Sequence, residues 1–118
     1  MENYTFRLRS GQDLFDSIES FVQEERIEAG CIVSSIGSLP RAFLRLANRD
    51  FHTEYNGYFE IVSMTGTVSL YGSHLHLSIS DGEGGTTGGS RVGGYPVYTT
   101  AEIVLAVFRD MVYSKSAT

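Results

Sequence analysis

Several residue types that define common classes of small proteins are scarce in this sequence. Cys31 is the only cysteine among 118 residues, which excludes an internal disulfide and a zinc ribbon, because both need cysteine pairs. No apolar run approaches the roughly 20 residues that a membrane span requires. The first residues also lack the apolar stretch of a secretion signal. We therefore expect a protein of the cytoplasm without a membrane partner.

Positive charge is scarce as well. The chain has 14 acidic and 9 basic residues, a net charge of -5, and Lys115 is its one lysine. A negative chain repels the phosphate backbone, and proteins that grip DNA unaided usually carry a basic stripe. The nearest feature is the series Arg41, Arg45 and Arg49, whose four-residue spacing places all three on one face of a helix or a strand. This face is either simply solvated or a weak nucleic-acid contact that homo-oligomerisation would multiply.

What is present indicates one small domain with a sizeable core. A chain of this length forms a single unit and buries roughly two thirds of its unfolded surface. We expect the domain to span residues 1–118, with a frayed tail at 113–118. Apolar residues at helical spacing predict one amphipathic helix over residues 13–30, ended by Gly30 in the left-handed conformation.

Alternating and β-branched segments predict six strands. They cover residues 3–10, 31–39, 41–47, 58–72, 74–80 and 95–108, with a polar loop at 48–57 and a candidate bulge at Gly66. Short connections between them favour an antiparallel sheet, with the helix on one face. The other face would need a partner, and a second copy of the same chain is a common one.

Two histidines alternate with leucines in the segment HLHLSIS. On a strand, His74 and His76 share a polar face, while the leucines between them face the core. The two rings supply half of the ligands of a tetrahedral zinc site. Asp81, Glu60, Glu102 or a residue of another subunit are candidates for the rest. The alternative is a pair of hydrogen-bonded histidines at a subunit contact.

The histidine strand is followed by a segment that is nearly half glycine, DGEGGTTGGSRVGG. A phosphate-binding loop would need a helix after its glycines and usually a lysine, and this segment has neither. We expect a flexible hairpin loop, or a loop whose glycines let it fold closely over the histidine face. His76 with Asp81 or Glu102 also resembles a general base and its orienting group, but no feature specifies a substrate. The residues therefore favour a domain without enzyme activity, and an enzyme stays open as the alternative.

The order of these motifs resembles a known family. FEIVSMTGTVS, then HLHLSISD, a pair of glycines and GYPVYTTAEIV are similar to the plants and prokaryotes conserved (PPC) domain. In plants this domain is joined to AT-hooks in the AT-hook motif nuclear-localised proteins. The resemblance implies an α+β fold, a mainly antiparallel sheet with one or two flanking helices, assembled as a homotrimer.

The resemblance also implies two functions. The first is a stand-alone trimeric interaction module that recruits unknown protein partners and is DNA-associated and regulatory, without an AT-hook of its own. The second is a small metal-binding or ligand-binding protein, or an enzyme, with zinc as the cofactor. Many prokaryotic members carry a third histidine after the paired glycines. Here His74 and His76 match the first two positions, and the third falls on Ser90 after Gly88 and Gly89.

Overall fold

The computed structural model describes residues 1–91 and 96–114, so residues 115–118 of the tail predicted at 113–118 lie outside them. Its elements are β1 (Glu2–Arg9), α1 (Leu14–Glu24), β2 (Gly30–Arg45), β3 (Thr53–Val68), β4 (His74–Ser80), β5 (Thr86–Arg91) and β6 (Thr100–Val107). All strand pairings are antiparallel, in the order β1-β6-β2-β3-β4-β5. The predicted fold, a mainly antiparallel sheet with one helix, is confirmed for the described part of the chain.

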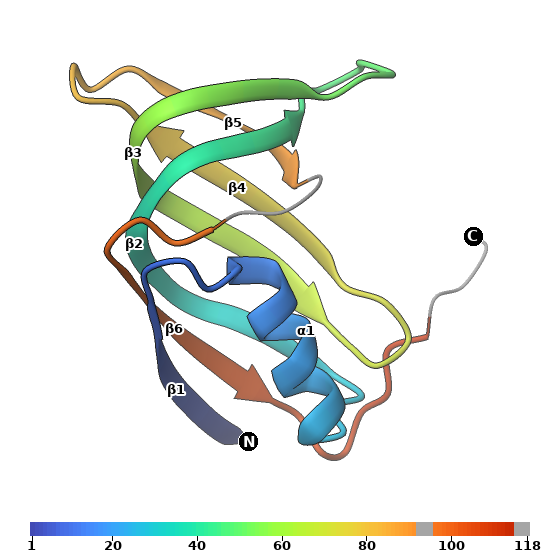
Figure 1. The fold of residues 1–118 in the computed structure, drawn as a ribbon. Helices are drawn as coiled ribbons and strands as arrows, with labels where there is room; N and C mark the ends of the chain where they lie inside the picture. The colour runs from blue at the N-terminus through green and yellow to red at the C-terminus, as the bar shows by residue number, and fades with distance from the viewer. Residues whose placement is uncertain (92–95, 115–118) are drawn as a thin grey trace.

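The sheet curls until its last strand meets the middle of the sheet again. Strand β5 pairs with β4 along one side and with the end of β2 along the other, where Leu44 faces Arg91 and Arg45 faces Ser90. Figure 1 shows the upper halves of β2 and β3 bending over β4 and β5. This second pairing joins two segments that are far apart in the sequence, and it shapes the candidate site.

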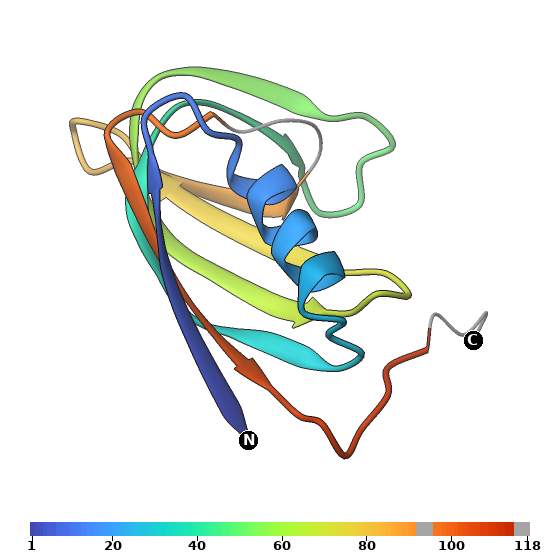
Figure 2. The same ribbon diagram turned by 60° about the horizontal axis from the view of Figure 1, so that its bottom comes forward.

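Helix α1 fills the open side of the curl (Figure 2). Asp13 caps it, because a carboxylate oxygen of Asp13 accepts hydrogen bonds from the backbone N–H groups of Phe15 and Asp16. The helix buries Leu14, Phe15, Ile18 and Val22 against the sheet. It ends earlier than the sequence predicts, since Arg26 rather than Gly30 adopts the left-handed conformation, with φ of 51°. No helix in the described residues is long and apolar enough to cross a bilayer.

Two predicted strands are in fact one. Residues 31–39 and 41–47 were expected to be separated at a turn, but β2 runs without a break from Gly30 to Arg45. Its register with β3 shifts between Leu39 and Arg41, at Pro40. Proline lacks the N–H group that a regular ladder needs, so it is accommodated where the pairing is irregular.

Strand β3 corrects two further predictions. It begins at Thr53, inside the expected loop at 48–57, and its register with β4 shifts between Ile61 and Ser63 rather than at Gly66. Gly66 instead has φ of 136°, and a Cβ atom there would collide with the backbone carbonyl of His74. Glycine is therefore needed for close contact between β3 and the histidine strand.

The glycine-rich segment is also more regular than the sequence predicts. Residues 86–91 form β5, paired with β4 over five positions, so the expected loop is limited in the described residues to the turn at its start. A Cβ atom on Gly88 would lie 2.7 Å from the Ser78 hydroxyl, and one on Gly89 would lie 2.5 Å from the Arg45 carbonyl oxygen. The glycines thus permit close packing. Gly93 and Gly94 lie outside the described residues.

The two faces of the sheet differ in their covering. The inner face, toward α1, holds the buried core. Among the described residues no element covers the outer face, and large apolar side chains of β2 and β3 are exposed there: Val33, Ile36, Tyr58 and Val62.

Near the end of the described chain, Tyr113 is not frayed, because its N–H donates to the Glu28 carbonyl and its own carbonyl accepts from Ser69.

Candidate functional site

The histidine pair lies on the outer face of β4. Leu75, Leu77 and Ile79 are at most 3% exposed, whereas His74 and His76 are exposed, so the predicted division of the strand into two faces is confirmed. The two Nε2 atoms lie 3.3 Å apart, and one ring donates a hydrogen bond to the other according to the tautomer. Both rings therefore direct the same nitrogen toward one point.

Ser90 joins this pair from the neighbouring strand. It lies opposite His76 in the β4–β5 register, and its hydroxyl oxygen is 3.4 Å from His76 Nε2. The family resemblance placed Ser90 at the position of a third histidine, and the structure brings that position next to His76. Whether the set binds a metal stays a prediction.

The pairing of β5 with β2 adds an arginine to the same row. Arg45 faces Ser90, Ser90 faces His76, and His76 faces Thr65 on β3. Side chains opposite one another in a sheet point to the same side, with Cβ atoms about 4.5–5.5 Å apart. The outer face thus carries a continuous row of guanidinium, hydroxyl and imidazole groups. Sequence reasoning missed Arg45 as a neighbour of the histidines, because only the β2–β5 contact brings it there.

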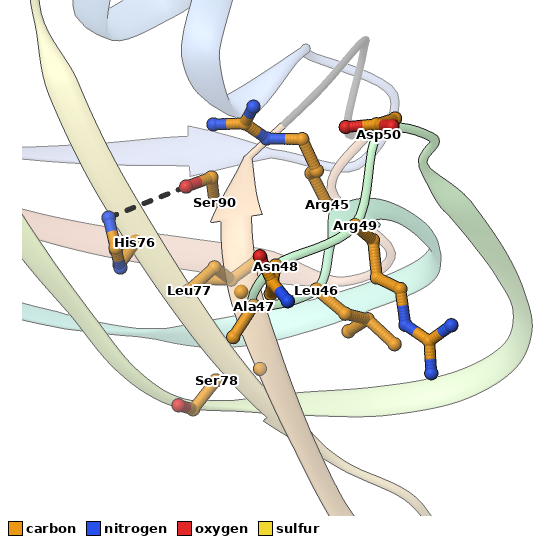
Figure 3. Close-up of a pocket in the computed structure, with 12 residues that line it drawn as sticks. Arg45, Leu46, Ala47, Asn48, Arg49, Asp50, His76, Leu77, Ser78 and Ser90 are labelled. Atoms are coloured by element: carbon orange, nitrogen blue, oxygen red, sulfur yellow. Dashed lines mark hydrogen bonds between the residues drawn. The ribbon is translucent and has the colours of Figure 1, made fainter.

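A cavity of about 670 Å³ opens beside this row. One wall is the segment Arg45–Asp50, which begins at the last residue of β2, and the other is formed by His76–Ser78 of β4 and Gly88–Ser90 of β5. Figure 3 shows His76 and Ser90 directed toward one another, with the Arg45–Asp50 segment beside them. Arg45 extends on the side of Ser90, whereas Arg49 extends in the opposite direction. This is the size of hollow that holds a small ligand.

The acidic residues that the sequence offered as further ligands lie elsewhere. Asp81 accepts hydrogen bonds from the N–H groups of Glu83 and Gly85, at the far end of β4. Glu60 faces Ser80 at that same end, and Glu102 forms an ion pair with Arg7 on β6 and β1. In the described residues no three side chains of His, Cys, Asp or Glu are grouped closely enough to hold a metal ion. Within one chain, none of these three acids completes the histidine site.

The donor set can be compared with the geometry of zinc. Two nitrogen atoms bound to one tetrahedral zinc ion at about 2.0–2.1 Å lie about 3.3 Å apart. The separation of the two imidazole nitrogens, 3.3 Å, equals this tetrahedral edge, and the 3.4 Å between His76 and Ser90 is close to it. The two imidazole nitrogens therefore fit one edge of a zinc shell, and the Ser90 hydroxyl lies beside one of them. Other positions would have to come from water or another subunit.

The arginine series does not lie on a single strand face as predicted. Arg41 and Arg45 are both exposed on β2, four residues apart, and share its outer side. Arg49 lies beyond the end of β2, one residue after Asn48, whose φ is 59°. Arg49 lines the same cavity as Arg45, whereas Arg41 does not line it.

Comparison with known proteins gives a family match over most of the chain. The model of the Plants and Prokaryotes Conserved (PCC) domain, the domain abbreviated PPC above, matches residues 1–109. A bifunctional protein GlmU from Synechococcus sp. is 42% identical over 103 residues, which are 87% of this chain and 17% of that protein. The chain thus spans about a sixth of the length of such curated relatives. AT-hook motif nuclear-localized protein 8 of Arabidopsis thaliana is 25% identical, over 89% of this chain and 29% of its own.

Solved structures show the same fold. A hypothetical protein from Salmonella enterica is 36% identical, with a TM-score of 0.96, over 99% of this chain and 85% of its own. A metal-containing protein from Archaeoglobus fulgidus is 26% identical, with a TM-score of 0.74, over 91% of this chain and 80% of its own. The curled sheet with its helix is therefore a fold that other proteins share.

Proposed function

The chain belongs to the Plants and Prokaryotes Conserved domain family, and from this premise we propose that it is an interaction domain that assembles as a homotrimer. In this proposal the assembled domain works in the cytoplasm and recruits protein partners into DNA-associated, regulatory complexes. Its similarity to an AT-hook motif nuclear-localized protein supports the association with DNA.

The observation that carries the proposal is the uncovered outer face of the sheet. Ile36 is 61% exposed on the central strand β2, and Val62 is 55% exposed on the adjacent strand β3. Apolar side chains on central strands are normally buried, and contiguous exposed ones mark protein interfaces. Symmetric association of identical chains covers such a face most simply.

The charge balance supports DNA association through partners rather than by direct contact. The chain carries a net charge of -5, and three of its arginines are already paired with acids: Arg7 with Glu102, Arg91 with Glu19, and Arg109 with Glu2. The negative net charge opposes the approach of a phosphate backbone. We therefore expect the protein alone to bind a duplex weakly, with a modest dependence on salt.

Light scattering coupled to gel filtration tests the assembly. We expect the wild-type protein to elute with three times the mass of the chain and Ile36→Glu to elute as a monomer, because a carboxylate on the outer face would be buried on association. Val112→Glu is the matched control, since Val112 is equally exposed but lies outside the strands. A monomeric wild type, or a trimeric Ile36→Glu variant, would contradict the proposal.

A second candidate function is metal binding at His74, His76 and Ser90. The 3.3 Å separation of the two imidazole nitrogens favours it, as does the similarity to a metal-containing protein from Archaeoglobus fulgidus. Zinc is the ion that two imidazoles suit best among common cellular cations. The two rings would hold it and Ser90 would lie beside it.

Metal analysis of protein purified without added zinc tests this function. We expect zinc in proportion to protein, and its loss in the double variant His74→Ala and His76→Ala. His52→Ala is the control, because His52 packs on Phe43 and is not among the residues that line the cavity. Absence of zinc from the wild type after incubation with excess zinc and dialysis would rule out the metal site and leave the assembly proposal unaffected.

A further inference from the structure

The row across the outer face combines three hydrogen-bonding groups that suit an oxyanion. Arg45 ends β2, and its register partner Ser90 lies between it and His76. Neighbouring strands are about 4.8 Å apart, so the side chain of Arg45 is long enough to reach a ligand bound beside Ser90. A guanidinium group donates two parallel hydrogen bonds to a phosphate or a carboxylate, and the Ser90 hydroxyl adds another.

The hollow next to this row exists because one position on the outer face has no side chain. Gly88 precedes Ser90 by two residues on β5 and therefore points to the same side. It faces Ser78, whose hydroxyl would be only 2.7 Å from a Cβ atom at position 88. The cavity of about 670 Å³ therefore has a floor of glycine and serine, with Arg45 at its edge. The cavity is large enough for a small molecule, and the serine hydroxyl groups can form hydrogen bonds with that molecule.

The charge around the cavity differs from that of the whole chain. Its lining includes two arginines, Arg45 and Arg49, and one acid, Asp50, although acids outnumber basic residues in the sequence. Neither arginine forms an ion pair with an acid among the described residues. Arg49 extends away from His76 in Figure 3 and lies 6.0 Å from the Phe51 ring, so Arg45 is the better placed cation.

From these observations we propose that the cavity between the Arg45–Asp50 segment and the β4–β5 hairpin binds a small oxyanion, a phosphate ester or a carboxylate of low mass. Arg45 holds the anionic group and Ser90 donates to it. A compact ligand is favoured over a nucleic acid, because the site is concave and the net charge of -5 opposes a long polyanion. The site requires neither a metal ion nor the homotrimer.

Isothermal titration with inorganic phosphate and, separately, with succinate tests the proposal. We expect one or both to bind with a dissociation constant near the millimolar range, as is usual for a fragment of a ligand. Arg45→Gln should weaken binding at least tenfold, and Arg49→Gln by a few fold. Arg41→Gln is the matched control, because Arg41 is exposed on the same strand but does not line the cavity, and it should bind like the wild type.

The same variants distinguish a built site from general charge attraction. Binding of neither anion by the wild type, or equal weakening by Arg41→Gln and Arg45→Gln, would overturn the proposal. Tight binding of a duplex of about 20 base pairs that is lost equally in all three arginine variants would also overturn it, and would assign this face to nucleic acid. Because gel filtration measures assembly independently, failure of this site and failure of the homotrimer are separate results.

Discussion

The two faces of the curled sheet use the same strands for different purposes. On β4, Leu75, Leu77 and Ile79 are buried against α1 and the rest of the core, while His74 and His76 project from the other side. The inner face is constrained by packing, since its buried side chains form one hydrophobic cluster. The outer face contributes little to folding and is free to carry polar groups, an apolar patch and a cavity. Function is therefore expected on the outer face.

The largest difference in stability between the two faces should be seen when two adjacent residues of β4 are each replaced by alanine. Leu77→Ala removes a side chain that is 1% exposed and should lower the free energy of unfolding by about 2–5 kcal/mol, because it leaves a cavity in the core. His76→Ala changes an exposed side chain and should alter it by no more than about 0.5 kcal/mol. Urea unfolding in the presence of a chelator measures both.

A similar loss in the two variants would break the distinction between the faces. It would mean that His76 is buried in the assembled protein, at a subunit contact. Repeating the unfolding at several protein concentrations would then separate a contribution of assembly from one of the folded chain, because only the former depends on concentration.

Much of the inner face could be predicted from the sequence. The alternation of Leu75, His76 and Leu77 determines which side is buried, and the apolar spacing of Ile18 and Val22 determines the face of α1. Where the prediction was wrong, a residue with weak strand preference was held in a strand by its neighbours. Pro40 lies in β2 at a register shift.

The candidate site could be predicted only in part. The strand period brought His74 and His76 together, and the family resemblance pointed to Ser90, but no local pattern connects Arg45 with either. That contact depends on β5, a strand that contains Gly88 and Gly89 and has little intrinsic strand preference. Pairing with β4 and β2 stabilises it, and pairing between distant segments is not visible in one sequence.

The next largest loss of stability is expected from a substitution in the floor of the outer cavity. Gly88→Ala places a Cβ atom 2.7 Å from the Ser78 hydroxyl and 2.9 Å from the Leu77 carbonyl oxygen, so β5 has to move away from β4. We expect a loss of about 1–3 kcal/mol in the free energy of unfolding, typical of overpacking. Gly82→Ala is the control, because nothing lies within 4 Å of a Cβ atom there. Equal stability of the two variants would show that β5 tolerates displacement.

A smaller effect is expected from restoring the third family histidine on the outer face. Ser90→His should increase zinc affinity at least tenfold, about 1.4 kcal/mol, because a third imidazole replaces a poor ligand next to His76. Titration against a competing chelator measures the affinity. Ser80→His is the control, since Ser80 lies on the same face of β4 but at the far end from the pair. Unchanged affinity in Ser90→His would mean that β5 does not hold position 90 beside the two rings.

The smallest effect belongs to the polar edge of the covered face, where β1 meets the end of α1. The Arg109 guanidinium donates to the Glu2 carboxylate and to the carbonyl oxygens of Glu25 and Arg26, so it joins the strand to the helix. The hydrogen bond from Arg109 is the main reason why the pKa of Glu2 is lowered from its ordinary value near 4.5. A lowered pKa in the folded state stabilises the fold above the ordinary value, and this contribution is lost as the pH falls through the folded value.

Thermal unfolding between about pH 5 and pH 3 tests this edge, since carboxylates titrate in that range. Wild-type Tm should fall more steeply with acid than that of Glu2→Gln, because the variant has no carboxylate to protonate at this position. Glu83→Gln removes a carboxylate from an exposed turn and should follow the wild type. The difference should be small, since Glu2 and Arg109 are each more than 40% exposed and water screens the pair. Parallel curves of Tm against pH for Glu2→Gln and wild type would show that the pair of Glu2 and Arg109 at this edge does not stabilise the fold.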